Sequence, residues 1–202
     1  MARYTGPRLR ISRRFNTPVF GSSKYLERKA YPPGQHGQSR RRKATDYALA
    51  LAEKQKMRFY YGLMEKQFRG VYEKAIRRRG VTGEIMLQIL ETRLDSAVFN
   101  LGFGYTRAQA RQMVVHGHIL VNGKRARTPS IALHEGDEIA IKDSEKSRHL
   151  ADKNLEYSTS RTVPEWMEID RSAYKGALKR LPTREDIEPI ANEQAIVEFY
   201  SR

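Results

Sequence analysis

Two arginines of this 202-residue chain, Arg107 and Arg111, are four residues apart, a type and spacing suited to binding an anion. Residues i and i+4 of a helix share one face, so the two guanidinium groups would lie together. Guanidinium groups bind phosphate and carboxylate oxygens. The pair fits a phosphate-binding face and an ordinary solvated face about equally well.

Basic residues beyond Arg111 add positive charge beside a predicted tight turn at Asn122-Gly123. Residues 128–145 then reverse the sign, with five acids against Lys142. A polyanion would approach the positive side and be repelled from the distal turn. The basic hairpin favours the binding interpretation. Against one acid, Asp95, residues 92–127 carry Arg93, Arg107, Arg111, Lys124, Arg125 and Arg127.

Helical spacing predicts two helices that position these arginines. Apolar residues recur at intervals close to 3.6 between Thr82 and Gly102, which predicts one amphipathic helix with an N-cap and a glycine stop. Thr106 and Gln109 have the form of a capping box. They predict a second, short helix over residues 107–116 that ends at a glycine.

Alternating apolar residues predict a small antiparallel sheet after the helices. Residues 119–121 end in Asn122-Gly123, the dipeptide best suited to a hairpin with two positive φ angles. Residues 131–133 and 139–141 alternate as further strands. The stretch 91–143 therefore reads as a complete unit of two helices and a sheet.

The first 45 residues hold much of the positive charge. They contain twelve basic residues and one acid, Glu27, so they contribute +11 of the net +15. Prolines and glycines interrupt them, which favours an extended segment ordered by its partner. An organelle transit peptide has a similar composition. Residues 40–43 fit a localisation signal, a solvated run or a nucleic-acid clamp, and their position before a helical domain favours the clamp.

Helices and a charge-neutral end complete the chain. Helices are predicted from an N-cap at Thr45 and again after Gly62, the second ending in Arg77-Arg78-Arg79. Residues 146–202 hold ten basic and ten acidic residues, a balance that favours structural or protein-contact work. Strands are expected near residues 166–169 and 177–181, and a final helix over residues 192–200.

Residue types argue against catalysis and metal binding. The chain has no cysteine, which excludes disulfides and removes the usual ligands of structural zinc. The histidines lack metal-ligand spacing, and no dinucleotide loop is present. We expect no cofactor, no metal and no enzymatic activity. No apolar run reaches the length of a membrane span, and a DNA-binding protein would fit the charge without a groove-reading motif.

Several motifs resemble a known family. Residues 92–95, 102–104, 106–112 and 121–124 resemble the RNA-binding module named after the fourth small-subunit ribosomal protein. This module also occurs in pseudouridine synthases, aminoacyl-tRNA synthetases and a heat-shock protein. The flanks resemble the ribosomal protein itself, through Gly34-Gln35-His36-Gly37, Tyr61-Gly62, Gln67-Phe68-Arg69 and Ile196-Val197-Glu198-Phe199-Tyr200. The chain departs from members that carry zinc-binding cysteines.

The resemblance implies an α+β fold in which a helical domain carries an inserted small module of helices packed on an antiparallel sheet. We expect a basic extended segment over residues 1–44 and a helical domain over 45–90 that is completed by 183–202. The RNA-binding module then covers residues 91–182, with its core at 91–143.

The resemblance also implies a function in the ribosome. The chain would be a structural constituent of the small subunit that binds small-subunit rRNA at a multi-helix junction and nucleates assembly. It would lie near the path by which mRNA enters, contact the fifth small-subunit ribosomal protein and affect translational accuracy. The location would be the cytoplasm or the plastid stroma. The alternative is a stand-alone RNA-binding or RNA-modifying protein, similar to a pseudouridine synthase.

Basic side chains of the tail, the helical domain and the module are the candidate RNA-binding residues. Residues 40–43 are also the candidates for the mRNA path. The full set is Arg3, Arg8, Arg10, Arg13, Arg14, Arg40, Arg41, Arg42, Lys43, Lys54, Lys56, Arg58, Arg69, Arg93, Arg107, Arg111, His116, Lys124 and Arg125.

Overall fold

A computed structural model of the chain describes residues 4–21, 24–39, 43–159, 161–188 and 190–201. It divides into two compact units. Unit 1 comprises Met1–Gly83 with Pro189–Arg202, and unit 2 comprises Glu84–Glu188. The fold is α+β, with helices in both units and a single five-stranded antiparallel sheet in the described part of unit 2.

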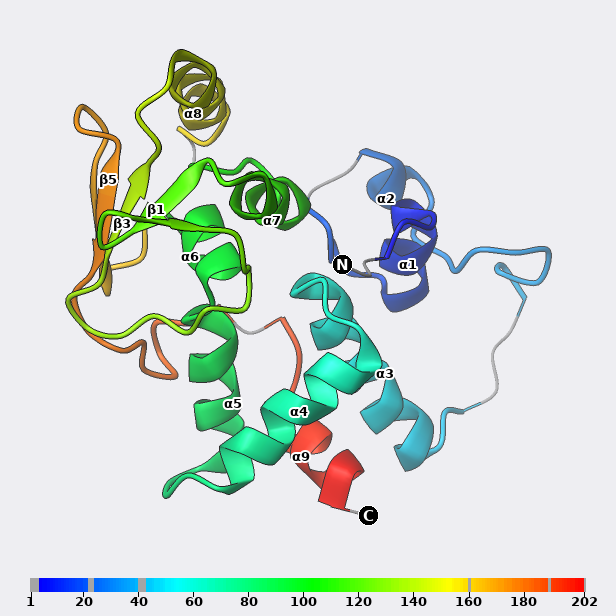
Figure 1. Cartoon of the computed structure of the whole chain (residues 1–202). Coiled ribbons are helices and arrows are strands. Elements are labelled where there is room, and N and C mark those ends of the chain that lie inside the picture. Colours follow the sequence, from blue (N-terminus) through cyan, green and yellow to red (C-terminus); the bar gives the residue numbers. More distant parts are fainter. Residues whose placement is uncertain (1–3, 22–23, 40–42, 160, 189, 202) are drawn as a thin grey trace. The chain divides into compact units, whose positions relative to one another are not determined.

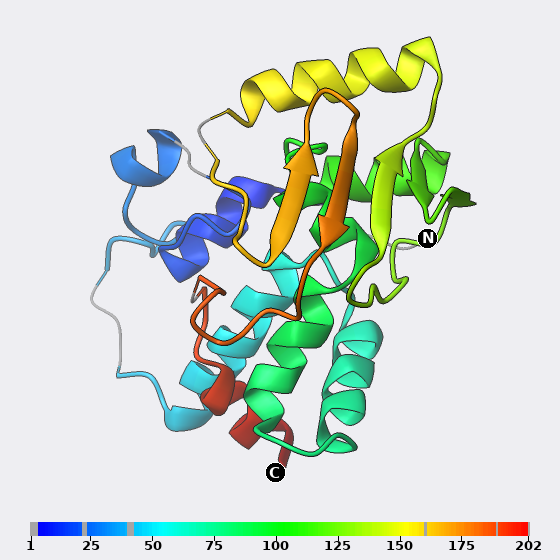
Figure 2. The same ribbon diagram turned by 90° about the vertical axis from the view of Figure 1, so that its left-hand side faces the viewer.

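The sheet of unit 2 has the strand order β2-β1-β3-β5-β4. Every neighbouring pair is antiparallel, and the register places Ile119 opposite Ala126 on one side and Ile141 on the other. Figure 2 shows β3, β4 and β5 side by side. The strands are β1 (Ile119–Val121), β2 (Lys124–Ala126), β3 (Glu138–Ile141), β4 (Met167–Asp170) and β5 (Lys175–Leu178).

Helices α6 (Leu94–Asn100) and α7 (Arg107–His116) lie on one side of this sheet (Figure 1). Their apolar residues and those of the strands form one core around Trp166, which is 1% exposed. Helix α8 (Glu145–Tyr157) crosses the ends of the strands (Figure 2). Half of the predicted capping box is present, because Thr106 Oγ1 accepts from the Gln109 backbone N–H at 3.2 Å. The Gln109 side chain accepts from the Tyr105 N–H at 3.1 Å and not from that of Thr106. Gly117 ends α7 with φ 73°.

The predicted single helix from Thr82 to Gly102 is wrong. The structure has α5 (Thr82–Glu91) and α6, separated at Thr92 and Arg93. At this break the backbone bonds to the loop 129–133, with Leu94 N–H donating to Ile131 O and Leu133 N–H donating to Thr92 O, each at 2.9 Å. Pairing between distant segments therefore interrupts a segment whose sequence contains no local helix stop.

Other strand predictions are partly confirmed. Strands β3, β4 and β5 form near the predicted positions. The predicted strand at 131–133 forms only an isolated bridge between Ala132 and Arg93. Helix α8 was not predicted.

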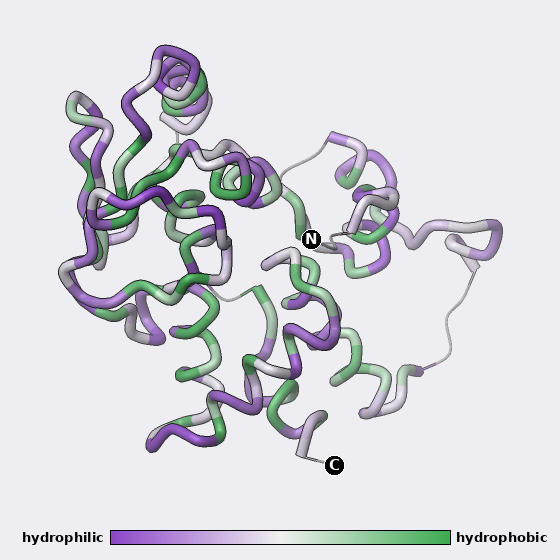
Figure 3. Tube along the Cα trace, in the orientation of Figure 1, coloured by the Kyte–Doolittle hydropathy of each residue, from purple (hydrophilic) through white to green (hydrophobic). Residues whose placement is uncertain are grey.

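Figure 3 shows hydrophobic residues along α5 and hydrophilic residues in the loop that follows α4.

Unit 1 is helical. Helix α3 (Asp46–Tyr60) starts at the predicted N-cap, Thr45, whose side chain accepts from the Ala48 N–H at 3.3 Å. Helix α4 (Glu65–Ile76) follows Gly62 as expected. The final helix, α9 (Glu193–Ser201), packs on α3, and Tyr200 stacks on Tyr72 of α4 with ring centroids 4.7 Å apart.

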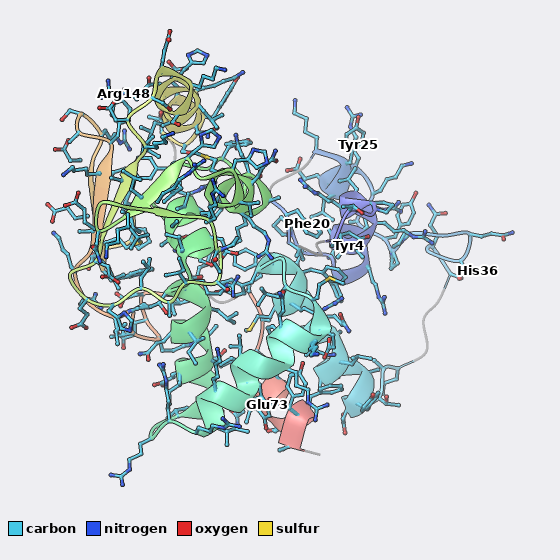
Figure 4. All side chains as sticks on the ribbon, viewed as in Figure 1. Tyr4, Phe20, Tyr25, His36, Glu73 and Arg148 are labelled. Carbon is cyan, nitrogen blue, oxygen red and sulfur yellow. The ribbon has the colours of Figure 1, made fainter. Side chains whose placement is uncertain are left out.

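The prediction of an extended tail is wrong for two segments, which form α1 (Arg8–Phe15) and α2 (Lys24–Arg28). Within unit 1, aromatic contacts join the tail to α3. Tyr4 lies 5.1 Å from Phe59 of α3 and 6.3 Å from Phe20, measured between ring centroids. Figure 4 shows Tyr4 and Phe20 together beside α1. Val19 is 2% exposed, so the tail contributes to the core of unit 1.

Candidate nucleic-acid interface

The turn between β1 and β2 has the geometry that its sequence predicts. Asn122 and Gly123 have φ angles of 50° and 76°, so both central residues are left-handed. The Asn122 side chain donates to Asp137 Oδ1 at 2.8 Å and accepts from the Glu138 N–H at 2.9 Å. The turn is therefore fixed to the loop that precedes β3.

The basic side chains Lys124, Arg125 and Arg127 form what we call the hairpin surface. All three are exposed. None of them has an ion-pair partner among the residues that the structure describes. Arg125 also has a structural contact, because it donates from Nε to Gly117 O and from Nη2 to His116 O, each at 3.0 Å. It thereby caps the carbonyl end of α7. Exposed cations without an acidic partner are suited to bind phosphate.

The arginines of the helices have a different environment. Arg93 makes a bidentate contact with Asp95, at 3.0 Å from Nε and 2.8 Å from Nη2. Arg111 reaches the same carboxylate, with Nη1 2.9 Å from Asp95 Oδ2. Arg93 and Arg111 are each 8% exposed, and Asp95 is 5% exposed. One buried carboxylate thus binds two buried guanidinium groups.

Arg107 is held in a similar way at the start of α7. Its Nη2 lies 3.2 Å from Glu91 Oε1, and its Nη1 donates to Ser96 Oγ at 3.0 Å. Glu91 also accepts from Asn100 Nδ2 at 2.6 Å. The guanidinium lies over the ring of Phe99 at 4.6 Å. We call Glu91, Arg93, Asp95, Arg107 and Arg111 the buried ion-pair cluster.

The buried ion-pair cluster changes the interpretation of Arg107 and Arg111. The sequence suggested a solvent-facing pair, either solvated or binding phosphate. In the structure Arg107 and Arg111 face α5 and α6, and Glu91 and Asp95 match their charge. Direct phosphate binding by these two arginines stays a prediction. Such pairs fix α7 relative to α6 within unit 2.

The tail of unit 1 presents Arg8, Arg10 and Arg14 of α1, all exposed. Arg13 is different. It donates to the backbone oxygens of Lys29, Tyr31 and Pro32, and its guanidinium lies 4.8 Å above the Tyr31 ring. Arg13 therefore organises the tail, whereas its three neighbours on α1 are accessible to a ligand.

All three candidates on α3 are engaged within unit 1. Lys54 is 4% exposed, pairs with Glu65 at 2.8 Å and lies near the rings of Phe199 and Tyr200. Lys56 pairs with Glu53 at 2.7 Å, and Arg58 is stacked on Phe59.

Two further candidates are exposed. Arg69 faces solvent and forms an i, i+4 pair with Glu73, and Lys43 faces solvent at the end of the tail. Arg3, Arg40, Arg41 and Arg42 lie outside the described residues, so the predicted clamp has no structural description beyond Lys43.

The structure adds two residues to the surroundings of His116 that the sequence did not single out. His118 lies with its ring centroid 6.2 Å from that of His116. Lys142 is brought to the same place by the pairing of β1 with β3, and its N–H donates to His118 O at 2.7 Å. The sequence His-Gly-His at the end of a helix indicates that His116 and His118 lie close together. No local pattern indicates the contact between His118 and Lys142.

The described residues contain neither a candidate metal-binding group nor a candidate membrane span. No group of three or more His, Cys, Asp or Glu residues there is arranged to hold a metal ion. No helix in those ranges is long and apolar enough to cross a membrane.

The fold and its basic surface define a class of RNA-binding protein. Residues 92–139 match the S4 domain, and residues 3–91 match the ribosomal protein S4/S9 N-terminal domain. The exposed hairpin surface and the two arginines that fix α7 all lie within the S4 domain match.

Full-length relatives identify the family. The chain is 53% identical to the small ribosomal subunit protein uS4 of Akkermansia muciniphila and 54% identical to that of Opitutus terrae. It is 47% identical to the protein of the same name from Thermus thermophilus. In each case the match covers 100% of both chains. The chain belongs to this family of structural, non-enzymatic proteins of the small ribosomal subunit.

Proposed function

We propose that this chain binds small-subunit rRNA directly at a multi-helix junction and so nucleates assembly of the subunit. The observation that carries the proposal is the hairpin surface, where Lys124 and Arg127 are exposed and have no acidic partner among the described residues. RNA helices repel one another through their phosphates. A protein that neutralises several of those phosphates lets the helices approach.

The two units would contribute different contacts. The hairpin surface of unit 2 is held at a fixed angle to α7 by the capping contacts of Arg125. Arg8, Arg10 and Arg14 of unit 1 add exposed charge on a short helix that aromatic contacts tie to α3. In this proposal the buried ion-pair cluster shapes unit 2, and Arg93, Arg107 and Arg111 act on RNA only through the position of α7.

Further roles follow from the family resemblance. We propose that residues 40–43 lie near the path of mRNA, that the chain contacts the fifth small-subunit protein and that it affects translational accuracy. The location is then the ribosome in the cytoplasm or the plastid stroma. The balanced charge of residues 146–202 supports a protein-contact role for that part of the chain. The full-length match to ribosomal proteins favours this function over a stand-alone RNA-modifying protein.

Filter binding over a salt series tests the proposal. The probe is small-subunit rRNA from the same organism, transcribed in vitro, with an unrelated RNA duplex as competitor. The triple variant Arg8→Gln, Arg10→Gln, Arg14→Gln should reduce the slope of log affinity against log salt by roughly 2 to 3 if all three bind phosphate. Lys179→Gln is the control, because Lys179 is exposed, pairs with Glu168 and is not among the candidate RNA-binding residues.

Crosslinking in cells gives the second readout. RNA recovered with the chain should be mainly small-subunit rRNA. Recovery mainly of tRNA or DNA, or equal affinity in vitro for the rRNA and the unrelated duplex, would overturn the proposal.

A further inference from the structure

Four basic residues lie close to the place where α7 passes into β1. We call them the histidine cluster: His116, His118, Arg125 and Lys142. The two imidazole rings lie on either side of Gly117, with centroids 6.2 Å apart. His116 is exposed and His118 is half-buried, so a ligand can reach this place from solvent.

Arg125 is held rigidly in this cluster. Its guanidinium contacts the carbonyl oxygens of His116 and Gly117. A Cβ atom at position 117 would overlap the guanidinium, and Gly117 also has φ 73°. Glycine is therefore needed here both for the backbone conformation and for the close approach. The cluster is an ordered arrangement and not a chance meeting of mobile side chains.

Acidic groups near the cluster are engaged elsewhere or point to solvent. Asp143, next to Lys142, pairs with Arg148 at 2.8 Å, and Glu145 is exposed in the first turn of α8. Lys146, also in that turn, adds another positive charge. Among the described residues, neither Arg125 nor Lys142 has an ion-pair partner. The cluster thus concentrates positive charge without a matched carboxylate.

Hydroxyl groups of α8 and the residue before it complete the surroundings of His118. Its Nδ1 is 2.9 Å from Ser147 Oγ, which in turn is 2.7 Å from Ser144 Oγ. Burial lowers the pKa of His118, and the positive charges of His116, Arg125 and Lys142 lower it further. The free protein therefore disfavours a proton on this imidazole, because no anion is present to offset the surrounding charge.

We propose that the histidine cluster binds a phosphate group of the RNA backbone and that an imidazole takes up a proton when it does. The inference rests on the proposed function and assigns a contact and a proton linkage to it. A backbone phosphodiester carries one negative charge, and beside His118 it offsets part of the surrounding positive charge. It favours the imidazolium form and so raises the proton affinity of the ring.

The direction of the pH effect follows from this linkage. The bound state has the higher histidine pKa, so RNA binding consumes protons between the free and the bound pKa. Affinity therefore rises as pH falls through neutrality. Each proton taken up changes log affinity by up to 1 per pH unit. For one histidine we expect binding about 3- to 10-fold tighter at pH 6 than at pH 8.

Variant chains separate this contribution from protonation of the RNA itself. Affinity for small-subunit rRNA is measured at fixed salt from pH 5.5 to 8, with the native chain and with His116→Gln/His118→Asn. Asparagine at position 118 retains a polar group for Ser147. His134→Asn is the matched control, because His134 is exposed in the acidic turn beside Asp137. If the double variant is unstable, His118→Asn alone retains the test, because the proton uptake is argued from His118.

The pH series has distinct outcomes for the inference and for the proposed function. We expect the native chain and His134→Asn to gain affinity at low pH, and the double variant to lose most of that gain. NMR of the histidine Cε1–H groups should show a higher pKa for His118 in the complex than in the free protein. Equal pH dependence of native and histidine variants would overturn the inference while leaving rRNA binding intact. Absence of specific rRNA binding at every pH would instead overturn the proposed function.

Discussion

The hairpin surface and the buried ion-pair cluster contain the same kinds of side chain in one small unit, yet they do opposite things. Lys124 and Arg127 face solvent without an acidic partner among the described residues. Arg93 and Arg111 are buried on the carboxylate of Asp95. The difference shows that the positions of a few acids, and not the number of arginines, decide which part of a basic protein is available to a polyanion.

The two regions should therefore respond differently to substitution. A buried charge that loses its partner destabilises the fold, because the remaining ion is desolvated without compensation. An exposed charge contributes little to stability and acts on a charged ligand through Coulomb attraction and counterion release. Stability and affinity thus separate the structural arginines from those that contact phosphate.

The largest effect is expected for Asp95→Ala. This change leaves the guanidinium groups of Arg93 and Arg111 buried without their carboxylate and should cost about 3–5 kcal/mol of the free energy of unfolding. The fluorescence of Trp166, the only tryptophan, reports unfolding of the unit 2 core in a denaturant series. Arg127→Ala is the exposed control and should change stability by less than about 0.5 kcal/mol. Equal stability of the two variants would show that the cluster is not structural.

Gly123→Val should lower the free energy of unfolding of unit 2 by an intermediate amount, through the turn that carries the hairpin surface. The residue has φ 76°, a region that costs a side chain with Cβ roughly 1–2 kcal/mol. A Cβ would meet no atom within 4 Å, so the expected loss comes from backbone strain alone.

A matched glycine variant tests that explanation. Gly70→Ala in α4 also enters open space but has ordinary helical angles, and it should stabilise unit 1 by about 0.5–1 kcal/mol. Melting followed by circular dichroism measures both variants. Loss of stability in both, or in neither, contradicts the assignment of strain to the hairpin turn.

The smallest effect on stability is expected at the ion pair of Lys54 with Glu65 in unit 1. Lys54 is buried there, as Arg93 and Arg111 are in unit 2. Burial raises the pKa of its partner Glu65, but hydrogen bonds from Lys54 and Tyr200 and the charges of Lys54 and Arg58 outweigh it, so the pKa lies below 4.5. A carboxyl with a lowered folded pKa adds stability above its unfolded pKa, and this contribution is lost as pH falls through the folded value.

Glu65→Gln should therefore destabilise unit 1 at pH 7 by about 1 kcal/mol, since the half-exposed carboxylate is screened by solvent. The deficit relative to the native chain should shrink below about pH 4.5. Denaturation at pH 7, 5 and 3.5 measures it. Glu73→Gln, in the exposed pair with Arg69, is the control and should show no such trend. A deficit that persists unchanged at pH 3.5 contradicts the ion-pair explanation.

Much of the fold follows from local sequence signals. The N-caps Thr45 and Thr106 each specify a helix start, and the Asn122-Gly123 turn specifies a hairpin. The structure confirms all three. The break between α5 and α6 has no such signal. It arises from backbone pairing with residues 129–133, about 40 residues along the chain, which no local pattern reveals.

The interface was harder to predict than the fold. Exposure of Lys124 follows from its place beside a tight turn. Burial of Arg107 and Arg111 depends on Glu91 and Asp95, which reach them only because α5, α6 and α7 pack together in unit 2. Helical spacing puts Lys54 on the same face of α3 as Leu51 and Met57, but no local pattern indicated that two aromatic rings of α9 lie against its ammonium group.

The most direct test compares two double variants in one measurement, the salt dependence of affinity for small-subunit rRNA. Lys124→Gln/Arg127→Gln should lower the slope of log affinity against log salt by roughly 1.4 to 1.8, about two phosphate contacts, with the Trp166 unfolding midpoint unchanged. Arg107→Gln/Arg111→Gln, measured at a temperature where it is folded, should lower stability and leave the slope as in the native chain. The opposite result, in which the α7 pair lowers the slope and the hairpin pair does not, would contradict the account.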